Sequence, residues 1–245
     1  MTTSLDSVTR LARRISDNSY VHLPAPEASR LLSDFSETAW SDWDEFRASW
    51  QDMPLDTYMA DGGRYRTRRH ATLTAAEGGT DLELMPHQPH YQTVDYNNLN
   101  GGIARHYEPI EDRIRKGGTF DSLLTLGARV SGALAPFSRW HIEAHQFRIT
   151  ADGTQNGQPT PEGVHRDGVT FVLMALVDRD NVTGGESTVY GVEKQPLNSF
   201  TLTEPRELVF VNDERVFHGV SPVLQDDSSR PGHRDVLVIT YRHRA

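Results

Sequence analysis

The chain has 245 residues, 36% of them hydrophobic, no cysteine, and a formal net charge of −9 at pH 7. The length suits one domain, and the missing cysteines exclude a disulfide framework, a thiolate zinc site and a cysteine nucleophile. An acidic chain without a long basic run is also a poor match for a protein whose main activity is binding a nucleic-acid backbone.

The sequence gives no sign of a membrane partner. No stretch approaches the roughly 18 consecutive apolar residues that a membrane-spanning helix requires. Residues 1–19 lack the apolar segment of a secretory signal peptide. We therefore expect a cytoplasmic protein without a nucleic-acid partner, and the sequence leaves its oligomeric state open.

The first 50 residues carry helical patterns with one short strand candidate, residues 20–23. A helix is predicted over residues 5–15, and its apolar stripe consists of Leu5, Val8, Leu11, Ala12 and Ile15. A second is predicted over residues 26–35, with Pro26 in its first turn. A further stripe at helical spacing, typical of core packing, consists of Trp40, Trp43, Phe46 and Trp50.

The middle of the chain mixes strands, loops and one helix. Residues 56–93 are rich in Gly, Arg and Pro, which predicts strands separated by loops. Residues 110–126 form a helix candidate that is interrupted near Gly117 and Gly118.

Residues 140–150 alternate well enough to form the first core strand, on which Gln146 and Arg148 share one face. Because the opposite face carries Phe147 and Ile149, we expect Gln146 and Arg148 to face a functional site. The nearby histidines, His141 and His145 among them, are interpreted as structural, as are His243 and Glu186.

The most informative motif is a His-x-Asp pair, His165 and Asp167, followed far downstream by His218. In a strand, side chains alternate between faces, so His165 and Asp167 would point the same way. Two imidazoles and one carboxylate form the facial triad that leaves open positions on a redox-active Fe(II) ion. The sequence therefore predicts that these three side chains bind one divalent metal.

Apolar strand candidates follow the His-x-Asp pair at residues 170–177, 207–212 and 234–241, with a turn at residues 183–186. The second of them leads into His218. This order is what an antiparallel roll needs to bring the distal histidine back to the pair.

Together these motifs resemble the Fe(II)/2-oxoglutarate-dependent dioxygenases, and more narrowly the bacterial branch that hydroxylates free L-amino acids, typified by L-isoleucine 4-hydroxylase. The resemblance is strongest over residues 141–241, with weaker similarity at residues 65–69 and 96–102. The segments that carry it are His165-x-Asp167, Gly184-Gly185-Glu186, Val216-Phe-His-Gly-Val-Ser-Pro222 and Arg234-Asp-Val-Leu-Val-Ile-Thr-Tyr241.

The resemblance implies a cofactor, cosubstrates and a reaction. Fe(II) would be bound by the His165, Asp167 and His218 triad, with 2-oxoglutarate and O2 as cosubstrates. An unactivated C–H bond of a free L-amino acid would be hydroxylated, with release of succinate and CO2.

Arg234 gains a role from the same resemblance. Arg234 would bind the distal carboxylate of 2-oxoglutarate, which a guanidinium can hold by two parallel hydrogen bonds. The alternative for Arg234 is a surface arginine paired with Asp235. Ser221 could hydrogen-bond to the cosubstrate, although a Ser-Pro turn is the simpler explanation.

A dense basic segment supplies candidates for substrate binding. Alternation would place Arg64, Arg66 and Arg68 on one face of a strand, where three like charges are unfavourable unless an anion meets them. The alternative is a solvated strand. We expect the substrate carboxylate to be bound by Arg66, Arg68 or Arg148, with Gln146 nearby.

We predict one α+β dioxygenase domain over residues 1–245, with a helical and strand part (1–135) and a metal-binding jelly-roll core (136–245). The fold would be a double-stranded β-helix with the N-terminal helices packed on one sheet. Two alternatives remain: a cupin-type isomerase or binding protein that uses the metal without 2-oxoglutarate, and an oxygenase acting on protein or on nucleic-acid bases. Which amino acid and which carbon would be oxidised stays open.

Overall fold

The computed structural model describes the backbone of residues 4–244 and the side chains of residues 6–244. The helices are α1 (Ser4–Asn18), α2 (Ala25–Phe35), α3 (Trp43–Ala48), α4 (Asp112–Arg115) and α5 (Gly118–Leu134). The strands are β1 (Tyr20–Leu23), β2 (Arg66–Ala76), β3 (Thr80–Leu84), β4 (Arg139–Ala151), β5 (Phe171–Asp180), β6 (Val182–Gly184), β7 (Glu186–Tyr190), β8 (Pro196–Thr201), β9 (Leu208–Asn212), β10 (Phe217–Val220), β11 (Val223–Gln225) and β12 (Gly232–Arg244).

A large antiparallel sheet forms the centre of the molecule, with its strands in the order β1-β9-β5-β12-β4-β2-β3. Its middle strand β12 pairs with β4 from Gly232 opposite Ala151 to Arg244 opposite Arg139. The other edge of β12 pairs with β5, whose apolar sequence suits a strand that is covered on both faces. The strands expected at residues 20–23, 140–150, 170–177, 207–212 and 234–241 correspond to β1, β4, β5, β9 and β12.

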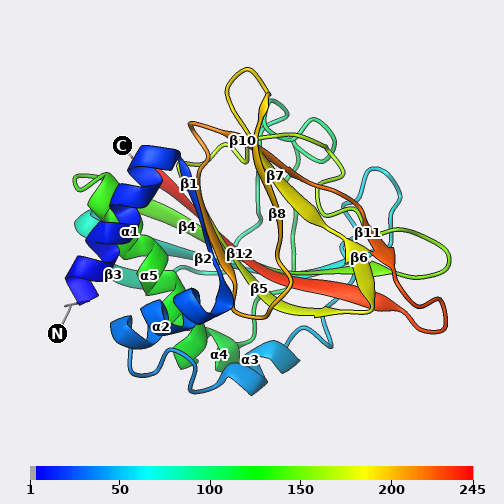
Figure 1. Ribbon diagram of the computed structural model, residues 1–245, viewed down its shortest axis with the longest axis horizontal. Coiled ribbons are helices and arrows are strands. Elements are labelled where there is room, and N and C mark those ends of the chain that lie inside the picture. Colours follow the sequence, from blue (N-terminus) through cyan, green and yellow to red (C-terminus); the bar gives the residue numbers. More distant parts are fainter. Residues whose placement is uncertain (1–3, 245) are drawn as a thin grey trace.

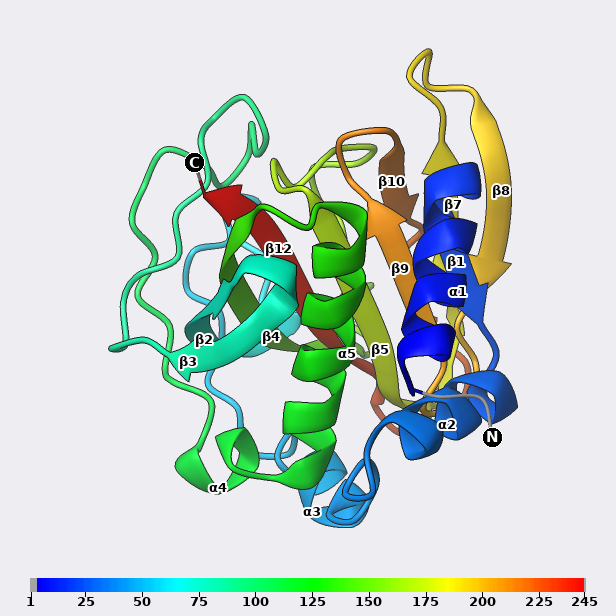
Figure 2. The ribbon, with the colours of Figure 1, turned by 90° about the vertical axis from the view of Figure 1, so that its left-hand side faces the viewer.

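The helices cover one face of this sheet (Figure 1), and α5 lies across β4, β12 and β5 in the view of Figure 2. The core under them contains alternate residues of the two long strands, namely Trp140, Ile142 and Ala144 of β4 and Leu237, Ile239 and Tyr241 of β12. On the helix side it contains Val8, Leu11, Ala12 and Ile15 of α1 and Leu123, Leu124 and Leu126 of α5. Because these residues of β4 and β12 point to the helices, the intervening residues point to the other face of the sheet.

The helical predictions for the N-terminal half are confirmed, with shifted boundaries. The stripe of α1 is buried over Val8 to Ile15, while the side chain of Leu5 lies outside the described residues. The helix predicted over residues 110–126 is two helices, α4 and α5, separated at residues 116–117. Trp43, Phe46 and Trp50 of the expected stripe are core residues, and Trp40 is partly buried against them. Helix α3 covers only residues 43–48, and Trp50 lies in the turn that follows.

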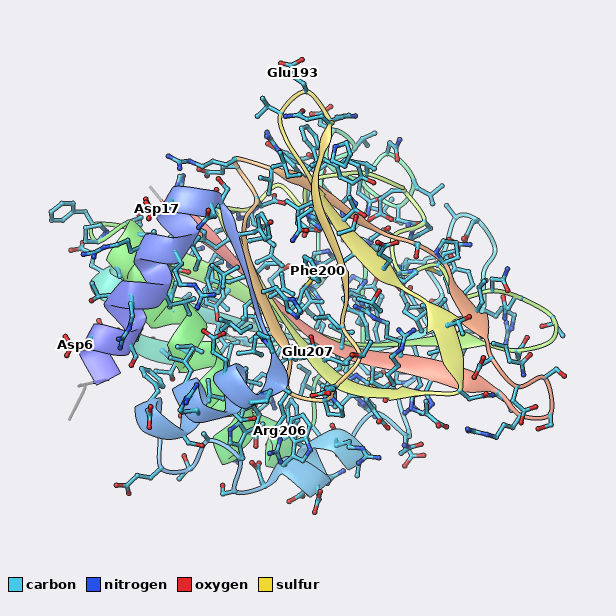
Figure 3. The ribbon with its side chains drawn as sticks, in the orientation of Figure 1. Asp6, Asp17, Glu193, Phe200, Arg206 and Glu207 are labelled. Carbon is cyan, nitrogen blue, oxygen red and sulfur yellow. The ribbon has the colours of Figure 1, made fainter. Side chains whose placement is uncertain are left out.

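A smaller antiparallel sheet, β10-β7-β8, lies on the face of the large sheet that the helices leave free, and β11 pairs with β6 beside it (Figure 1). Apolar side chains of both sheets form the layer between them, among them Val172, Leu176, Val189, Val209 and Val236. The two sheets are also joined at one edge, where Phe200 of β8 stacks on His22 of β1 with ring centroids 4.6 Å apart. His22 in turn contacts Glu207, so that Phe200 and Glu207 both lie along β1 in Figure 3.

In the described part of the chain, no helix combines the length and the apolarity that crossing a membrane requires.

Candidate active site

The three residues of the predicted metal site come together between the two sheets. His218 lies on β10, and His165 is held beside it by two backbone hydrogen bonds of 2.9 Å, from each amide to the other carbonyl. This pairing is a single bridge, so the expected strand through His165 and Asp167 is wrong. The chain turns directly after Asp167, because Gly168 has a φ of 77°. The turn, rather than strand alternation, directs the carboxylate of Asp167 toward both histidines.

The geometry of the triad suits a metal ion. Asp167 Oδ1 lies 3.5 Å from His165 Nε2, and Asp167 Oδ2 lies 3.5 Å from His218 Nε2. Ligand atoms from all three side chains lie within 4.8 Å of one another. Bonds of about 2.1 Å to one ion place adjacent ligands roughly 3 Å apart at right angles, so a small contraction would complete the site.

The hydrogen bonds and charges around the triad favour a bound cation. His165 Nδ1 donates to the carbonyl oxygen of Gly163 at 2.9 Å, so Nε2 is the ring nitrogen that faces Asp167 and would bind a metal. Burial alone would lower the pKa of His165, but Asp167 and Glu162 outweigh it and raise that pKa to about 9. Burial and the charge of His165 lower the pKa of His218 to about 4. The carboxylates therefore attract positive charge to this point, and a divalent ion would supply it.

Asp213 holds the turn that carries Asp167, and sequence reasoning missed it. Its carboxylate accepts the backbone N–H groups of Asp167, Gly168 and Val169 at 3.1, 2.9 and 3.3 Å. Burial, followed by the charge of Asp167, raises the pKa of Asp213 to about 7. Its position just after the end of β9 is the only signal in the sequence, and that signal does not reveal that three backbone N–H groups donate to its carboxylate.

The triad opens onto a cavity whose wall is the inner face of β2, β4, β5 and β12. Cross-strand register arranges this wall in rows: Arg234, Ile149 and Arg66 form the first row. Val236, Phe147 and Arg68 form the second, Val238, His145 and His70 the third, and Thr240, Glu143 and Thr72 the fourth. The cavity therefore has a guanidinium at each end of its first row and an apolar strip along β12.

Arg234 is 4% exposed, and among the described residues its Nε and Nη2 have no hydrogen-bond partner. Burial, with the nearby charge of Arg179, lowers the pKa of Arg234 to about 10, still well above neutrality. The alternative of a surface arginine paired with Asp235 is wrong, because Asp235 binds Arg148 instead. A buried cation with free N–H groups at a cavity wall is a site for an anion.

Arg66 and Arg68 both line the cavity, but they differ in how many of their N–H groups are free to bind an anion. Arg66 is neutralised by Asp56, with Nε and Nη2 each 2.8 Å from Asp56 Oδ2. The guanidinium of Arg68 lies 3.7 Å from the same oxygen, and in the described structure its Nε has no partner. The rings of Tyr107 and Phe147 lie on it at 3.8 and 4.4 Å from its central carbon. Arg68 is therefore the better candidate to bind a carboxylate.

Gln146 and Arg148 are not in the cavity, and the prediction that they face it is wrong. Gln146 Nε2 donates to Ser49 Oγ at 2.7 Å on the helix side of the sheet. Arg148 makes a bidentate pair with Asp235 at 2.7 and 2.6 Å. The prediction failed because polar residues on the helix side have their own buried partners.

The residues of β4 that do line the cavity are on the opposite face: His141, Glu143, His145, Phe147 and Ile149. The interpretation of His141 and His145 as merely structural is therefore incomplete. His145 accepts a hydrogen bond on Nδ1 from Arg68 Nη2 at 2.8 Å.

Arg105 is a further cavity residue that the sequence did not reveal. It is 1% exposed, its Nη2 donates to Gln92 at 2.8 Å, and its Nε has no partner within residues 4–244. Gln92 in turn donates to the carbonyl of Asp167 at 3.2 Å, so the 90–105 segment is tied to the metal turn. Arg105 stands in no strand pattern, which is why periodicity could not find it.

Ser221 lies outside the residues that line the cavity, and it is exposed. Its hydroxyl accepts the backbone N–H of Glu186 at 2.9 Å, and its own N–H donates to the carbonyl of Glu186 at 2.8 Å. Ser221 and Glu186 therefore stabilise the local turn by bonding to each other, and the expected contact of Ser221 with a cosubstrate is wrong.

Two histidines and a carboxylate that could hold a metal ion lie in one cavity with a buried arginine that has free N–H groups, and this combination is typical of metal-dependent enzymes that bind an anionic cosubstrate. The chain belongs to the 2OG-Fe dioxygenase family, whose model it matches over residues 47–240. The family resemblance is therefore confirmed. The protein is an Fe(II)/2-oxoglutarate-dependent dioxygenase with O2 as its second cosubstrate, and the cupin-type alternative without 2-oxoglutarate is excluded.

Relatives and solved structures agree with this assignment. The chain is 25% identical over 203 residues to a 3(1)-hydroxy-L-isoleucine 4-dioxygenase of Pantoea ananatis (strain AJ13355), covering 81% of this chain and 80% of that protein. It is 25% identical over 198 residues to an L-isoleucine-4-hydroxylase of Bacillus thuringiensis, covering 78% and 81%. The crystal structure of a bsmA homolog from Methylobium petroleophilum PM1 superposes with a TM-score of 0.84 at 33% identity, covering 96% and 92%.

Proposed function

We propose that this dioxygenase hydroxylates an unactivated C–H bond of a free L-amino acid, with release of succinate and CO2. The observation that carries the proposal is that the cavity holds two separate sets of buried guanidinium N–H groups without partners among the described residues, at Arg234 and at Arg68 with Arg105. Two carboxylate sites are what an enzyme needs when its cosubstrate and its substrate are both carboxylic acids. Both curated relatives carry names that refer to isoleucine or a hydroxylated isoleucine.

The metal would be held by His165, Asp167 and His218. When bound, the iron supplies the oxidising chemistry for which 2-oxoglutarate and O2 are consumed. The protein's own contribution is to hold the reactants: Asp213 fixes the turn of Asp167, and Gly163 fixes the orientation of His165.

Arg234 would bind the distal carboxylate of 2-oxoglutarate. Its Nε and Nη2 are the two groups that lack partners in residues 4–244, and they form one edge of the guanidinium. That edge matches the two oxygens of a carboxylate, which is the bidentate geometry that distinguishes arginine from lysine.

The substrate carboxylate would bind at Arg68, with Arg105 beside it. Arg66 is less available because Asp56 already satisfies it. The apolar side chains that line the same cavity are those of Phe147, Val172, Met174, Val236 and Val238, among others. An aliphatic side chain would be buried there next to the metal, while its polar end is held by the arginines.

The proposal extends to the fold and its organisation. The large sheet and the small sheet enclose the site in the manner of a double-stranded β-helix, with the helices packed on the outer face of one sheet. We also propose that residues 1–245 act as one domain, since the core under α1 and α5 includes β4 and β12, which form the cavity wall. A cytoplasmic location fits the need of this chemistry for Fe(II) and 2-oxoglutarate.

The decisive experiment measures succinate formed by the purified protein with Fe(II), ascorbate and 2-oxoglutarate across a panel of free L-amino acids and their amides. We expect aliphatic L-amino acids to stimulate succinate formation, and kcat/KM to be at least about 100-fold lower for the amides, because each ~1.36 kcal/mol of lost binding is tenfold. Equal activity on acid and amide, or activity only on a polypeptide or polynucleotide, would disprove the substrate class.

A further inference from the structure

A buried carboxylate lies in the cavity wall beside the proposed carboxylate site. Glu143 is on β4, its side chain is 12% exposed, and it lines the cavity. Its ion-pair contacts within the described structure are all to histidines, namely His70, His90, His141 and His145. The catalytic roles proposed above do not use this cluster.

One imidazole ring separates Glu143 from Arg68. Arg68 Nη2 donates to His145 Nδ1 at 2.8 Å, because a guanidinium can only donate. In a neutral imidazole the proton then resides on Nε2, which lies 3.6 Å from Glu143 Oε2. A cation and an anion thus stand at the two ends of His145, on the same side of the sheet.

Glu143 carries a full negative charge. Burial raises its pKa, but the contacts with His90, His141 and His145 outweigh burial and hold the pKa well below the usual value. Burial also lowers the pKa of His90 and His145, and that of His70 to about 3.

Glu143 also has acceptor capacity left. An ionised carboxylate offers about four acceptor positions. In the described structure its hydrogen bonds come from His90 Nδ1 at 2.5 Å and from His141 Nε2 at 3.4 Å, with His145 Nε2 at 3.6 Å, so the carboxylate can still accept from a further group, and Glu143 lines the cavity.

We propose that Glu143 binds the α-ammonium group of the substrate while Arg68 binds its α-carboxylate, so that the Arg68–His145–Glu143 arrangement recognises the zwitterion. The inference rests on the proposed function, and it adds that a free α-amino group is required. His145 acts as a positioning residue that sets the spacing of the two charges, and His90 orients the carboxylate of Glu143.

A second metal ion is the competing occupant, since His70, His90, Glu143 and His145 offer ligand atoms within 4.8 Å of one another. Two observations oppose it. The Nε2 proton of His145 occupies the position that a metal would need, and Arg68 holds that tautomer in place. Moreover, Arg68 and Arg105 both act on His90 as nearby positive charges. A divalent ion would add two more, whereas a zwitterion adds no net charge.

The test compares the free L-amino acid that the wild type uses best with its desamino analogue, the same acid with hydrogen in place of the ammonium group. Wild type, Glu143→Gln and Glu143→Asp are assayed for kcat, KM and 2-oxoglutarate dependence. We expect wild type to prefer the amino acid at least about 100-fold in kcat/KM. Glu143→Gln should reduce this preference below about fivefold, mainly by raising KM for the amino acid. Glu143→Asp should retain most of the preference, and neither variant should change KM for 2-oxoglutarate more than about twofold.

The outcomes separate the two proposals. If no free L-amino acid is turned over by wild type, the proposed function itself fails. If amino acids are turned over but wild type accepts the desamino acid equally well, or folded Glu143→Gln keeps the wild-type preference, only the role of Glu143 fails. A titration with Co(II) that finds two ions per wild-type chain and one per Glu143→Gln chain would overturn the inference in favour of a metal site.

Discussion

Arg66 and Arg234 lie in the same row of the large sheet, one on each side of Ile149, yet among the described residues only Arg66 has a carboxylate partner. Both side chains line the cavity, and their Cα atoms are about two strand spacings, roughly 10 Å, apart. Asp56 satisfies the first. The second keeps an open donor edge, and this difference supports the proposal that Arg234 binds the cosubstrate carboxylate.

We therefore expect substitutions of Arg234 to weaken the binding of 2-oxoglutarate more than the binding of the amino acid. Arg234→Lys keeps the charge but loses the bidentate edge, so we expect KM for 2-oxoglutarate to rise about 10- to 100-fold with smaller changes in the KM of the amino acid. Arg234→Met should lose nearly all 2-oxoglutarate-dependent turnover. The measurement is succinate formation against 2-oxoglutarate concentration, and unchanged kinetics in Arg234→Met would show that the cosubstrate binds elsewhere.

Asp213 should control metal affinity without touching the metal. Asp213→Asn replaces one acceptor oxygen with an NH2 group that faces three backbone donors of the metal turn. We expect the affinity for Co(II), used as a spectroscopic substitute for Fe(II), to fall about 10- to 100-fold.

Two variants calibrate this titration. His218→Ala should lose the site altogether, because it removes a proposed ligand. Asp226→Asn, at an exposed position on the loop before β12, should bind Co(II) like wild type. Wild-type affinity in Asp213→Asn would mean that the turn keeps its shape without the carboxylate.

Gly168 is a position where the turn after Asp167 tolerates no side chain. Its φ is 77°, and a Cβ there would lie 2.5 Å from the ring of Tyr96. Gly168→Ala should lower the free energy of unfolding by about 2–3 kcal/mol and weaken metal binding, since the strain falls on the metal turn. Gly62→Ala is the matched control, because Gly62 has a φ of 71° with nothing within 4 Å. Thermal or urea unfolding of both variants separates the backbone cost from the clash, and equal losses would show that Tyr96 moves freely.

The sequence could predict that His165, Asp167 and His218 come together, because it carries His-x-Asp and one later histidine in an apolar context. Arg234 is singled out by its place in the motif order, and it lines the same cavity. The sequence could not show which face of β4 points into the cavity. Gln146 and Arg148 are satisfied by Ser49 and Asp235, which lie 97 and 87 residues away in sequence, so nothing near them shows which face is buried under helices.

Arg105 and Asp213 show a second limit of sequence reasoning. The residues next to each of them in the sequence give no sign of the contacts they make. Arg105 contacts Gln92, and Asp213 accepts hydrogen bonds from the amides of the 167–169 turn. Periodicity detects strands and helices, whereas these two side chains lie in loops. Their roles depend on the spatial register of the sheets, which only the folded structure supplies.

Glu207 should contribute to the pH dependence of stability at the edge where the two sheets meet (Figure 3). Burial raises its pKa, but the backbone N–H groups of Glu204 and Thr203 and the ring of His22 outweigh burial, and the net pKa is lowered. A carboxyl group whose pKa is lower in the folded state stabilises the fold above its unfolded pKa of about 4.3, and that stabilisation is lost as the pH falls through the folded pKa.

We therefore expect Glu207→Gln to lower the free energy of unfolding by about 1–2 kcal/mol at pH 7, with the difference from wild type shrinking below about pH 4. The measurement is urea unfolding between pH 3 and 8. Glu193→Gln, at the exposed tip of the β7–β8 loop in Figure 3, is the control and should follow wild type throughout. A Glu207→Gln curve that runs parallel to wild type down to pH 3 would show that the hydrogen bonds of the side chain, rather than its charge, stabilise this edge.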